Sequence, residues 1–373
     1  MGRLAPEAVT RSVTLRLAAV SESARRLGRA CAILGDEVRL GDARVLVDLA
    51  EEDAASAAGE LAAAALLVDA VPLAWRHPLL RVAALAGVPT AGRAALHGRA
   101  ARVLDARGAA VGLVAAQLLA AEATGEPWAT RVLRRAAADA RDRGAPDVAA
   151  LLLRHAHAER STHTGLRLEL ARAEIAAGEP AGAARLGELL GEQDEPAART
   201  RLALELGDAL MSQREHREAA AILRAALRGD SGDEPGRQLL AMLAVCERYA
   251  PGPDDCGAEG RLAALVAGLA GTTPGERYAL AVDAIIRPRG TAAESAAAAR
   301  LVQRAWPDGL LPRGALGGAA VNLITPMRWT MRRRGWSASS VSRASSAYRP
   351  RGCRRRPSWG PACACAARSL RPS

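Results

Sequence analysis

The chain has 373 residues, half of them hydrophobic, which allows two or three domains and a sizeable core. All 51 basic residues are arginine, because the sequence contains no lysine. A Walker-type phosphate loop and Schiff-base chemistry both require a lysine amine, so both are excluded. The net charge of +11 is uneven: 13 arginines and no acid follow Asp308, whereas residues 1–308 carry 38 arginines against 40 acids.

No signal-peptide-like segment opens the chain, and no run of about 18 apolar residues is present. We therefore expect a cytoplasmic protein without a membrane partner. Three of the six cysteines lie in the body of the chain, at Cys31, Cys246 and Cys256. We expect these three to be reduced and buried, as small hydrophobic residues.

The body of the chain, from Thr14 to about Ile324, predicts an all-α fold. Apolar residues recur there at intervals of three and four, as in 163–177 and 215–227, while arginine and glutamate occupy the opposite face. Strand-like alternation of polar and apolar residues is almost missing.

Helix-breaking segments recur in this body at a regular interval. They begin at Gly144, Gly178 and Ser212, 34 residues apart. This is the period of tetratricopeptide-like helix hairpins, whose apolar faces are buried by stacking on neighbouring repeats. We therefore predict a helical-repeat domain over 101–325; the alternative is a generic helical bundle. We expect small residues at the helix crossings, namely Ala149, Ala150, Ala183, Ala219 and Ala220.

The segment 13–100 predicts a different unit, preceded by a flexible N-terminus at 1–12. Helices fit 22–34, 41–50 and 54–69, and a short extended segment begins at Pro72. Three helices followed by an extended piece are the outline of a winged-helix domain.

The helix at 54–69 occupies the position of a winged-helix recognition helix. Base recognition in the major groove requires arginine, lysine, asparagine or glutamine on that helix. Its charged residues are Glu60 and Asp69. We therefore expect no specific DNA recognition by this unit, and expect it to pack against a neighbouring domain.

Several stretches, in this order, carry a resemblance to a known family: 32–36, 76–81, 97–104, 115–121 with Glu126-Pro-Trp, and 143–146. They resemble the large ATP-binding regulators of the LuxR family, the MalT-like members of the STAND type. The resemblance implies an ATPase, a winged helix, a helical-repeat sensor and a C-terminal helix-turn-helix. This chain resembles the second and third of these parts, so we expect a fragment that lacks the ATPase half and the DNA-binding end.

His77 and Arg81 belong to the sharpest of these stretches. The resemblance implies that they lie on the nucleotide-facing side of the winged helix, where His77 senses bound phosphate. The alternative is that His77 caps a helix whose first residue is Pro78, a favoured position for proline. The second interpretation is favoured for this chain.

The basic segment 326–373 predicts a disordered tail. It holds three cysteines, three tryptophans and no acid, and we attribute this abrupt change of composition to a frameshift near codon 325. Its arginine runs would attract phosphates without sequence preference. They are Arg332, Arg333, Arg334, Arg354, Arg355 and Arg356.

No catalytic constellation is recognisable in the sequence, and we expect no bound cofactor or metal. His155 and His157 stand two residues apart and so point away from each other on a helix, which favours solvated surface histidines over metal ligands. The expected function is non-enzymatic recognition of a protein partner or small inducer by the helical-repeat surface, with Arg135, Arg167 and Glu169 as candidate contacts. The alternatives are non-specific nucleic-acid binding by the tail and a non-functional remnant of a gene.

Overall fold

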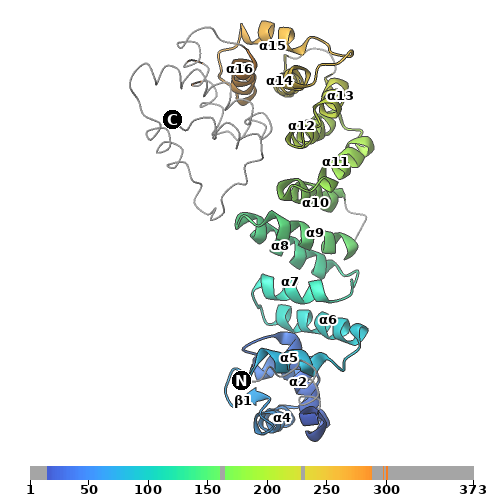
Figure 1. The fold of residues 1–373 in the computed structure, drawn as a ribbon, viewed down its shortest axis with the longest axis vertical. Helices are drawn as coiled ribbons and strands as arrows, with labels where there is room; N and C mark the ends of the chain where they lie inside the picture. The colour runs from blue at the N-terminus through green and yellow to red at the C-terminus, as the bar shows by residue number, and fades with distance from the viewer. Residues whose placement is uncertain (1–14, 160–163, 228–231, 288–296, 298–299, 301–373) are drawn as a thin grey trace, which may run out of the picture. The chain divides into compact units, whose positions relative to one another are not determined.

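The structure, a computed structural model, describes residues 15–159, 164–227 and 232–287, together with Ala297 and Arg300. The described residues form an all-α fold with one short strand pair, so the predicted fold class is confirmed. They belong to two compact units, 1–182 and 183–373 (Figure 1). The predictions for 1–12 and 326–373 lie outside the described residues.

The first unit begins with three helices and a strand pair: α2 (Glu22–Leu34), α3 (Leu40–Leu46), α4 (Glu51–Ala63), β1 (Leu67–Val68), β2 (Ala74–Trp75) and α5 (Pro78–Leu85). The two strands are antiparallel, with Leu67 opposite Trp75. A bridge between Val38 and Leu73 adds the segment after α2 to this pair. The extended segment predicted at Pro72 is therefore one arm of a small hairpin.

Two of the three helices predicted here have different limits. The predicted helix 41–50 ends at Leu46, because Asp48 adopts a left-handed conformation with φ of 52°. The predicted helix 54–69 begins at Glu51 and ends at Ala63, because Ala65 is also left-handed, with φ of 55°, and turns the chain into β1. Three acidic residues fill the first turn of α4, where the helix dipole favours negative charge.

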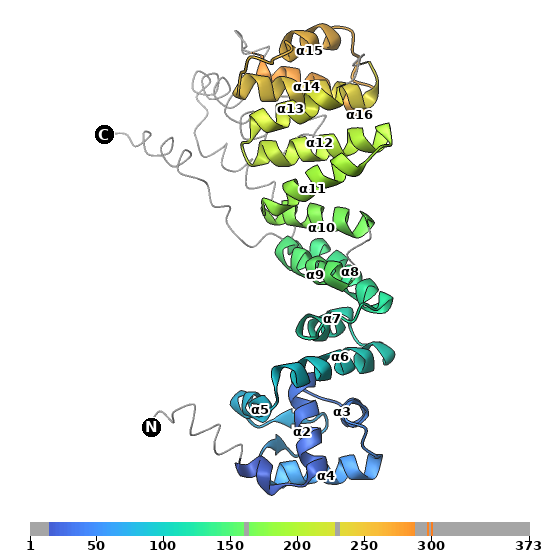
Figure 2. The ribbon, with the colours of Figure 1, turned by 90° about the vertical axis from the view of Figure 1, so that its right-hand side faces the viewer.

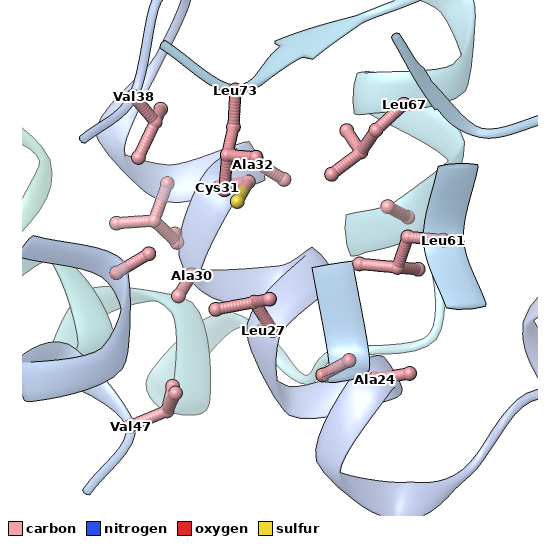
Figure 3. Close-up of a cluster of buried hydrophobic side chains, with 14 of the residues drawn as sticks. Ala24, Leu27, Ala30, Cys31, Ala32, Val38, Val47, Leu61, Leu67 and Leu73 are labelled. Atoms are coloured by element: carbon pink, nitrogen blue, oxygen red, sulfur yellow. The ribbon is translucent and has the colours of Figure 1, made fainter. Parts of the chain in front are cut away.

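A buried cluster of small and branched apolar side chains holds this part together (Figure 3). Leu27 and Ala30 of α2 lie at its centre, and Leu61 of α4 and Leu73 of the hairpin pack around them. Because apolar residues of α2 recur at intervals of three and four, one face of the helix is buried.

The rest of the first unit is a succession of helices, each packed on the next: α6 (Thr90–Ala106), α7 (Val111–Ala120), α8 (Pro127–Asp142), α9 (Pro146–Glu159) and α10 (Thr164–Ala177) (Figure 2). A second buried cluster runs through them. The two clusters meet on α6, where Ala100 belongs to the first and Ala101 to the second. The predicted domain boundary at residue 100 therefore falls inside a continuous helix that contributes to both cores.

Four turns between consecutive helices share one backbone feature. Gly108, Gly144, Gly178 and Arg214 have positive φ, at intervals of 36, 34 and 36 residues. Glycine after a helix end adopts this left-handed conformation without a steric penalty. The predicted breaks at Gly144 and Gly178 coincide with turns, and the break predicted over 212–216 contains the turn at Arg214, between the end of α12 at Ser212 and the start of α13 at His216.

The second unit contains α11 (Ala181–Glu192), α12 (Pro196–Ser212), α13 (His216–Ala226), α14 (Glu234–Tyr249), α15 (Ala258–Val266) and α16 (Pro274–Ile286). Helix α14 is its centre, because α12, α13, α15 and α16 all pack on it. The five alanines predicted at helix crossings are all buried. A Cβ added at Gly207 of α12 would lie 2.8 Å from Leu223 of α13, so these helices approach closely.

Candidate functional site

The first unit has a groove between the α6–α7 turn and α8, which we name the α6–α8 groove. It encloses about 970 Å³ and is lined by residues of 105–114 and of 128–143. Its floor includes Val111, Val114 and Val132, and its charged side chains come mainly from α8. The groove therefore combines an apolar floor with a charged wall.

The charged wall consists of Arg131, Arg135 and Asp139 of α8 and of Arg143, the residue directly after α8, which are spaced four residues apart. Successive members at this spacing are neighbours on the helix surface, each turned by about 40° from the one before. Throughout the described part of the chain, no hydrogen bond or ion pair engages the three guanidinium groups. All three arginines are exposed to solvent.

An aromatic side chain closes the N-terminal end of this wall. Trp128 donates from its ring nitrogen to Glu126 at 2.7 Å, and the Arg102 guanidinium lies 5.4 Å from its ring centroid. Arg102 also pairs with Glu126. These contacts restrain the indole in one orientation at the edge of the groove.

A buried carboxylate fixes the start of α8. Glu159, at the end of α9, accepts hydrogen bonds from the Thr124 backbone nitrogen at 2.7 Å, the Thr124 hydroxyl at 3.1 Å and the Gly125 nitrogen at 2.5 Å. This holds the loop before α8 against the next helix, so the arginine wall is presented by a rigid element. Glu159 was not among the residues predicted from the sequence.

The three predicted partner contacts are not brought together. Arg135 lines the α6–α8 groove, whereas Arg167 and Glu169 of α10 do not. The Glu169 carboxylate accepts a hydrogen bond from Nε of Arg134 at 2.9 Å. This hydrogen bond raises the pKa of the Arg134 guanidinium. Arg131 and Arg143 were not predicted as contacts, although their spacing of four and eight residues from Arg135 is visible in the sequence.

The side chains of His77 and Arg81 both form hydrogen bonds with backbone groups at helix ends. His77 precedes α5, and its Nδ1 accepts from the Leu79 backbone nitrogen at 3.1 Å, as in the capping alternative. Arg81 donates from Nε to the Ala32 carbonyl at 2.9 Å, and lies 3.7 Å from Asp36. The last carbonyl groups of a helix have no partner within the helix, so Arg81 supplies one for α2.

The expectation that His155 and His157 are solvated surface residues is wrong. Both are half-buried on α9, and Nε2 of His155 is shielded from solvent without a hydrogen-bond partner. Across the described ranges, no group of three or more histidine, cysteine or acidic side chains is arranged to hold a metal ion.

Two of the three body thiols are buried as predicted. Burial raises the pKa of Cys31 and of Cys246 to about 12, so both remain protonated at neutral pH. The prediction is wrong for Cys256, which is exposed in the loop after α14. That loop is anchored by its backbone nitrogens, and so does not need the side chain for packing.

The second unit has a groove of similar size, which we name the α11–α14 groove. It encloses about 990 Å³ and is lined by residues of 190–203, 222–227 and 233–239. Its arginines are occupied: Arg199 donates to the carbonyls of Leu190 at 3.3 Å and Gln193 at 2.9 Å, and Arg201 donates to its own helix. This groove offers fewer free cations to a ligand.

A nearly buried carboxylate, Glu247 of α14, organises the second unit. It accepts from the backbone nitrogens of Cys256 at 3.0 Å and Ala258 at 2.9 Å, and from Arg224 at 3.3 Å. Burial by itself would raise its pKa, but these donors outweigh burial and hold the pKa below its usual range. The ionised carboxylate thus joins α13, α14 and α15.

The six arginines proposed for nucleic-acid binding, between Arg332 and Arg356, lie outside the described residues.

Among the described helices, none is by itself long and apolar enough to cross a membrane. Helices α5 and α6 together have the length and apolar composition of a membrane span, but they are bent by 116° from each other.

No protein-family model, curated protein or solved structure matches the chain.

Proposed function

We propose that this chain is the non-enzymatic recognition module of a LuxR-type transcriptional regulator, in which a helical-repeat array binds a protein partner or a small inducer. The observation that carries the proposal is the α6–α8 groove, where Arg131, Arg135 and Arg143 stand on a rigid helix without partners among the described residues. Free guanidinium groups beside an apolar floor are suited to binding rather than to maintaining the fold.

The helix hairpins support a tetratricopeptide-like array. Their turns recur every 34 to 36 residues, and small residues lie at the crossings, as at Ala149 and Gly207. In such arrays each hairpin is stabilised by its neighbours, which leaves grooves along the stack for ligands. Regulation then consists of ligand binding that changes how the array engages the other parts of the regulator.

The N-terminal helices support a winged-helix unit that does not recognise DNA. Helix α4, in the position of the recognition helix, carries no cation. Its Glu60 is already engaged, because it accepts from the backbone nitrogen of Ser21 at 2.9 Å and from its hydroxyl at 3.0 Å. A helix with this charge would be repelled by phosphates, so we propose that the unit packs against a neighbouring domain.

The regulator assignment is tested by sequencing the gene and about a kilobase on each side, and translating all frames. We expect an upstream frame with a Walker-type phosphate loop and a downstream frame with a helix-turn-helix pattern. Flanking frames with neither pattern would overturn the assignment. A mobility-shift assay with the full chain and a chain ending at residue 325 tests the tail separately, because phosphate binding by the tail disappears with it.

A further inference from the structure

We infer that the α6–α8 groove binds an extended peptide segment with acidic side chains at alternate positions. The inference rests on the proposed function and specifies its ligand class. It depends on the charge order along the wall, which is positive at Arg131 and Arg135, negative at Asp139 and positive at Arg143.

The spacing of the wall matches an extended peptide. Residues four apart on a helix are separated by about 6 Å along its axis, since the rise is about 1.5 Å per residue. Alternate side chains of an extended chain point to the same side and are about 6.6 Å apart. An extended peptide that runs along α8 and follows this turn of about 40° per step therefore places every second side chain opposite one member of the wall.

The charge order then defines a pattern. Opposite Arg131 and Arg135 the peptide presents two carboxylates, opposite Asp139 a basic side chain, and opposite Arg143 another carboxylate. This corresponds to Glu-x-Glu-x-Lys-x-Glu in one chain direction and to Glu-x-Lys-x-Glu-x-Glu in the other. Each guanidinium then makes a charge-assisted hydrogen bond that solvent alone supplies in the free protein.

A peptide fits this wall better than a nucleic acid does. A nucleic-acid strand carries a negative charge on every nucleotide, and would therefore be forced past the carboxylates of Asp139 and Asp105, which also lines the groove. A peptide can place a neutral or basic residue there, and its backbone N–H groups can donate to these carboxylates. The chain's own segment after Asp308 is excluded by charge, because it has 13 arginines and no acid.

The experiment measures binding of a fluorescein-labelled Ala-spaced peptide, Glu-Ala-Glu-Ala-Lys-Ala-Glu, to the full chain by anisotropy. The matched probe is Lys-Ala-Glu-Ala-Glu-Ala-Glu, which has the same composition but a charge order that fits the wall in neither direction. We expect the first probe to bind at least about tenfold more tightly, since in either chain direction two favourable contacts are replaced by repulsive ones. Equal binding of the two probes would overturn the inference.

Two double variants locate the site. Arg131→Gln with Arg135→Gln removes two wall charges, and we expect an affinity loss of about 100-fold, or about tenfold per charge-assisted contact. Arg134→Gln with Arg141→Gln removes the same charge from the same helix outside the groove, and we expect a change below about twofold. Equal losses in both variants would show that net charge alone attracts the probe. Unchanged thermal unfolding of the first variant separates a binding effect from misfolding.

A peptide carrying a benzophenone identifies where it binds. After photolysis, mass spectrometry should find the adduct within residues 105–143. An adduct confined to residues after 308 would assign binding to the basic segment, and preferential capture of a single-stranded oligonucleotide by the groove would assign the wall to nucleic acid; either result overturns the inference. The proposed function is decided independently by the flanking gene sequence, so the two failures are distinguishable.

Discussion

The α6–α8 and α11–α14 grooves are almost equal in size, about 970 and 990 Å³, and both are lined by arginines, yet they differ in what those arginines contact. In the first, Arg131, Arg135 and Arg143 have no partner in the described structure. In the second, Arg199 and Arg201 donate to backbone carbonyls. An arginine in a groove therefore indicates a binding site only where the fold has left its donors free.

The carboxylates of the two units differ among themselves in the same way, since some form exposed pairs and others are buried and hold backbone nitrogens. In the first unit Arg134 and Glu169 form an exposed pair between α8 and α10, which contributes little to stability. In the second unit Glu247 is only 8% exposed, and its carboxylate accepts hydrogen bonds from two backbone nitrogens and from Arg224. Glu247 thus plays the part in the second unit that Glu159 plays in the first, where it holds the loop before α8 against α9.

The largest loss of stability should come from truncating a buried side chain of α8, the helix that carries most of the arginine wall. Leu133 is fully buried on the face of α8 opposite solvent, and Leu133→Ala should lower stability by about 2–5 kcal/mol through lost burial and a cavity. Native-state hydrogen exchange should show the loss in 127–177. Leu240→Ala is the matched control, because Leu240 is 1% exposed in α14, and it should act on 234–286 instead. A uniform loss in both units from either variant would contradict the division into two units.

The next effect tests the role of charge in the second unit. Glu247→Ala removes the acceptor for two backbone nitrogens and leaves Arg224 with only Asp255 as a carboxylate partner, at 3.6 Å. We expect a loss of about 2–3 kcal/mol, measured by urea unfolding. Glu234→Ala tests a second such carboxylate, because Glu234 accepts a hydrogen bond at 2.7 Å from the hydroxyl of Thr273, the residue that caps α16.

The pH dependence of the second unit follows from the same carboxylate. Because the pKa of Glu247 is lower in the folded protein than in an unfolded chain, its stabilisation is fully present above the unfolded pKa of about 4.3. The stabilisation is lost as the pH falls through the lower folded pKa. Urea midpoints between pH 7 and pH 3 should therefore fall more for the native chain than for Glu247→Gln. Parallel curves would show that other carboxylates dominate acid unfolding.

A smaller effect sharpens the interpretation of His77. His77→Ala removes the cap of α5 and should cost about 1 kcal/mol, whereas His77→Ser, which retains a capping acceptor, should cost a few tenths. Thermal unfolding with both variants measures the difference. Equal losses for alanine and serine would show that the imidazole acts through packing and not through the hydrogen bond to Leu79.

The smallest effect is expected where the groove itself is changed. Arg131→Gln and Arg135→Gln should each alter the free energy of unfolding by less than about 0.5 kcal/mol, because neither side chain has a partner to lose. Arg134→Gln should cost about 0.2–1 kcal/mol, because it breaks the exposed pair with Glu169. A larger loss at Arg131 than at Arg134 would mean that the wall serves the fold.

Much of the helical architecture was predictable because it is a local property. The limits of α2 at residues 22–34 and the hairpin turns at Gly144 and Gly178 follow from apolar periodicity and from the left-handed preference of glycine. The ends of α3 and α4 were predicted wrongly, since Asp48 takes a left-handed conformation that aspartate adopts only occasionally and Ala65 takes one that alanine disfavours. Contacts from the hairpin and from α2 outweigh that local preference.

The sequence by itself determined that the chain is helical, that it breaks at intervals of about 34 residues, and that lysine chemistry is excluded. Only the tertiary structure decided which arginines are free. Arg134 and Arg135 are neighbours with the same side chain, yet one pairs with Glu169 and the other lines the groove. The physical reason is that adjacent residues on a helix point about 100° apart, so their partners are chosen by the elements that happen to pack on each side.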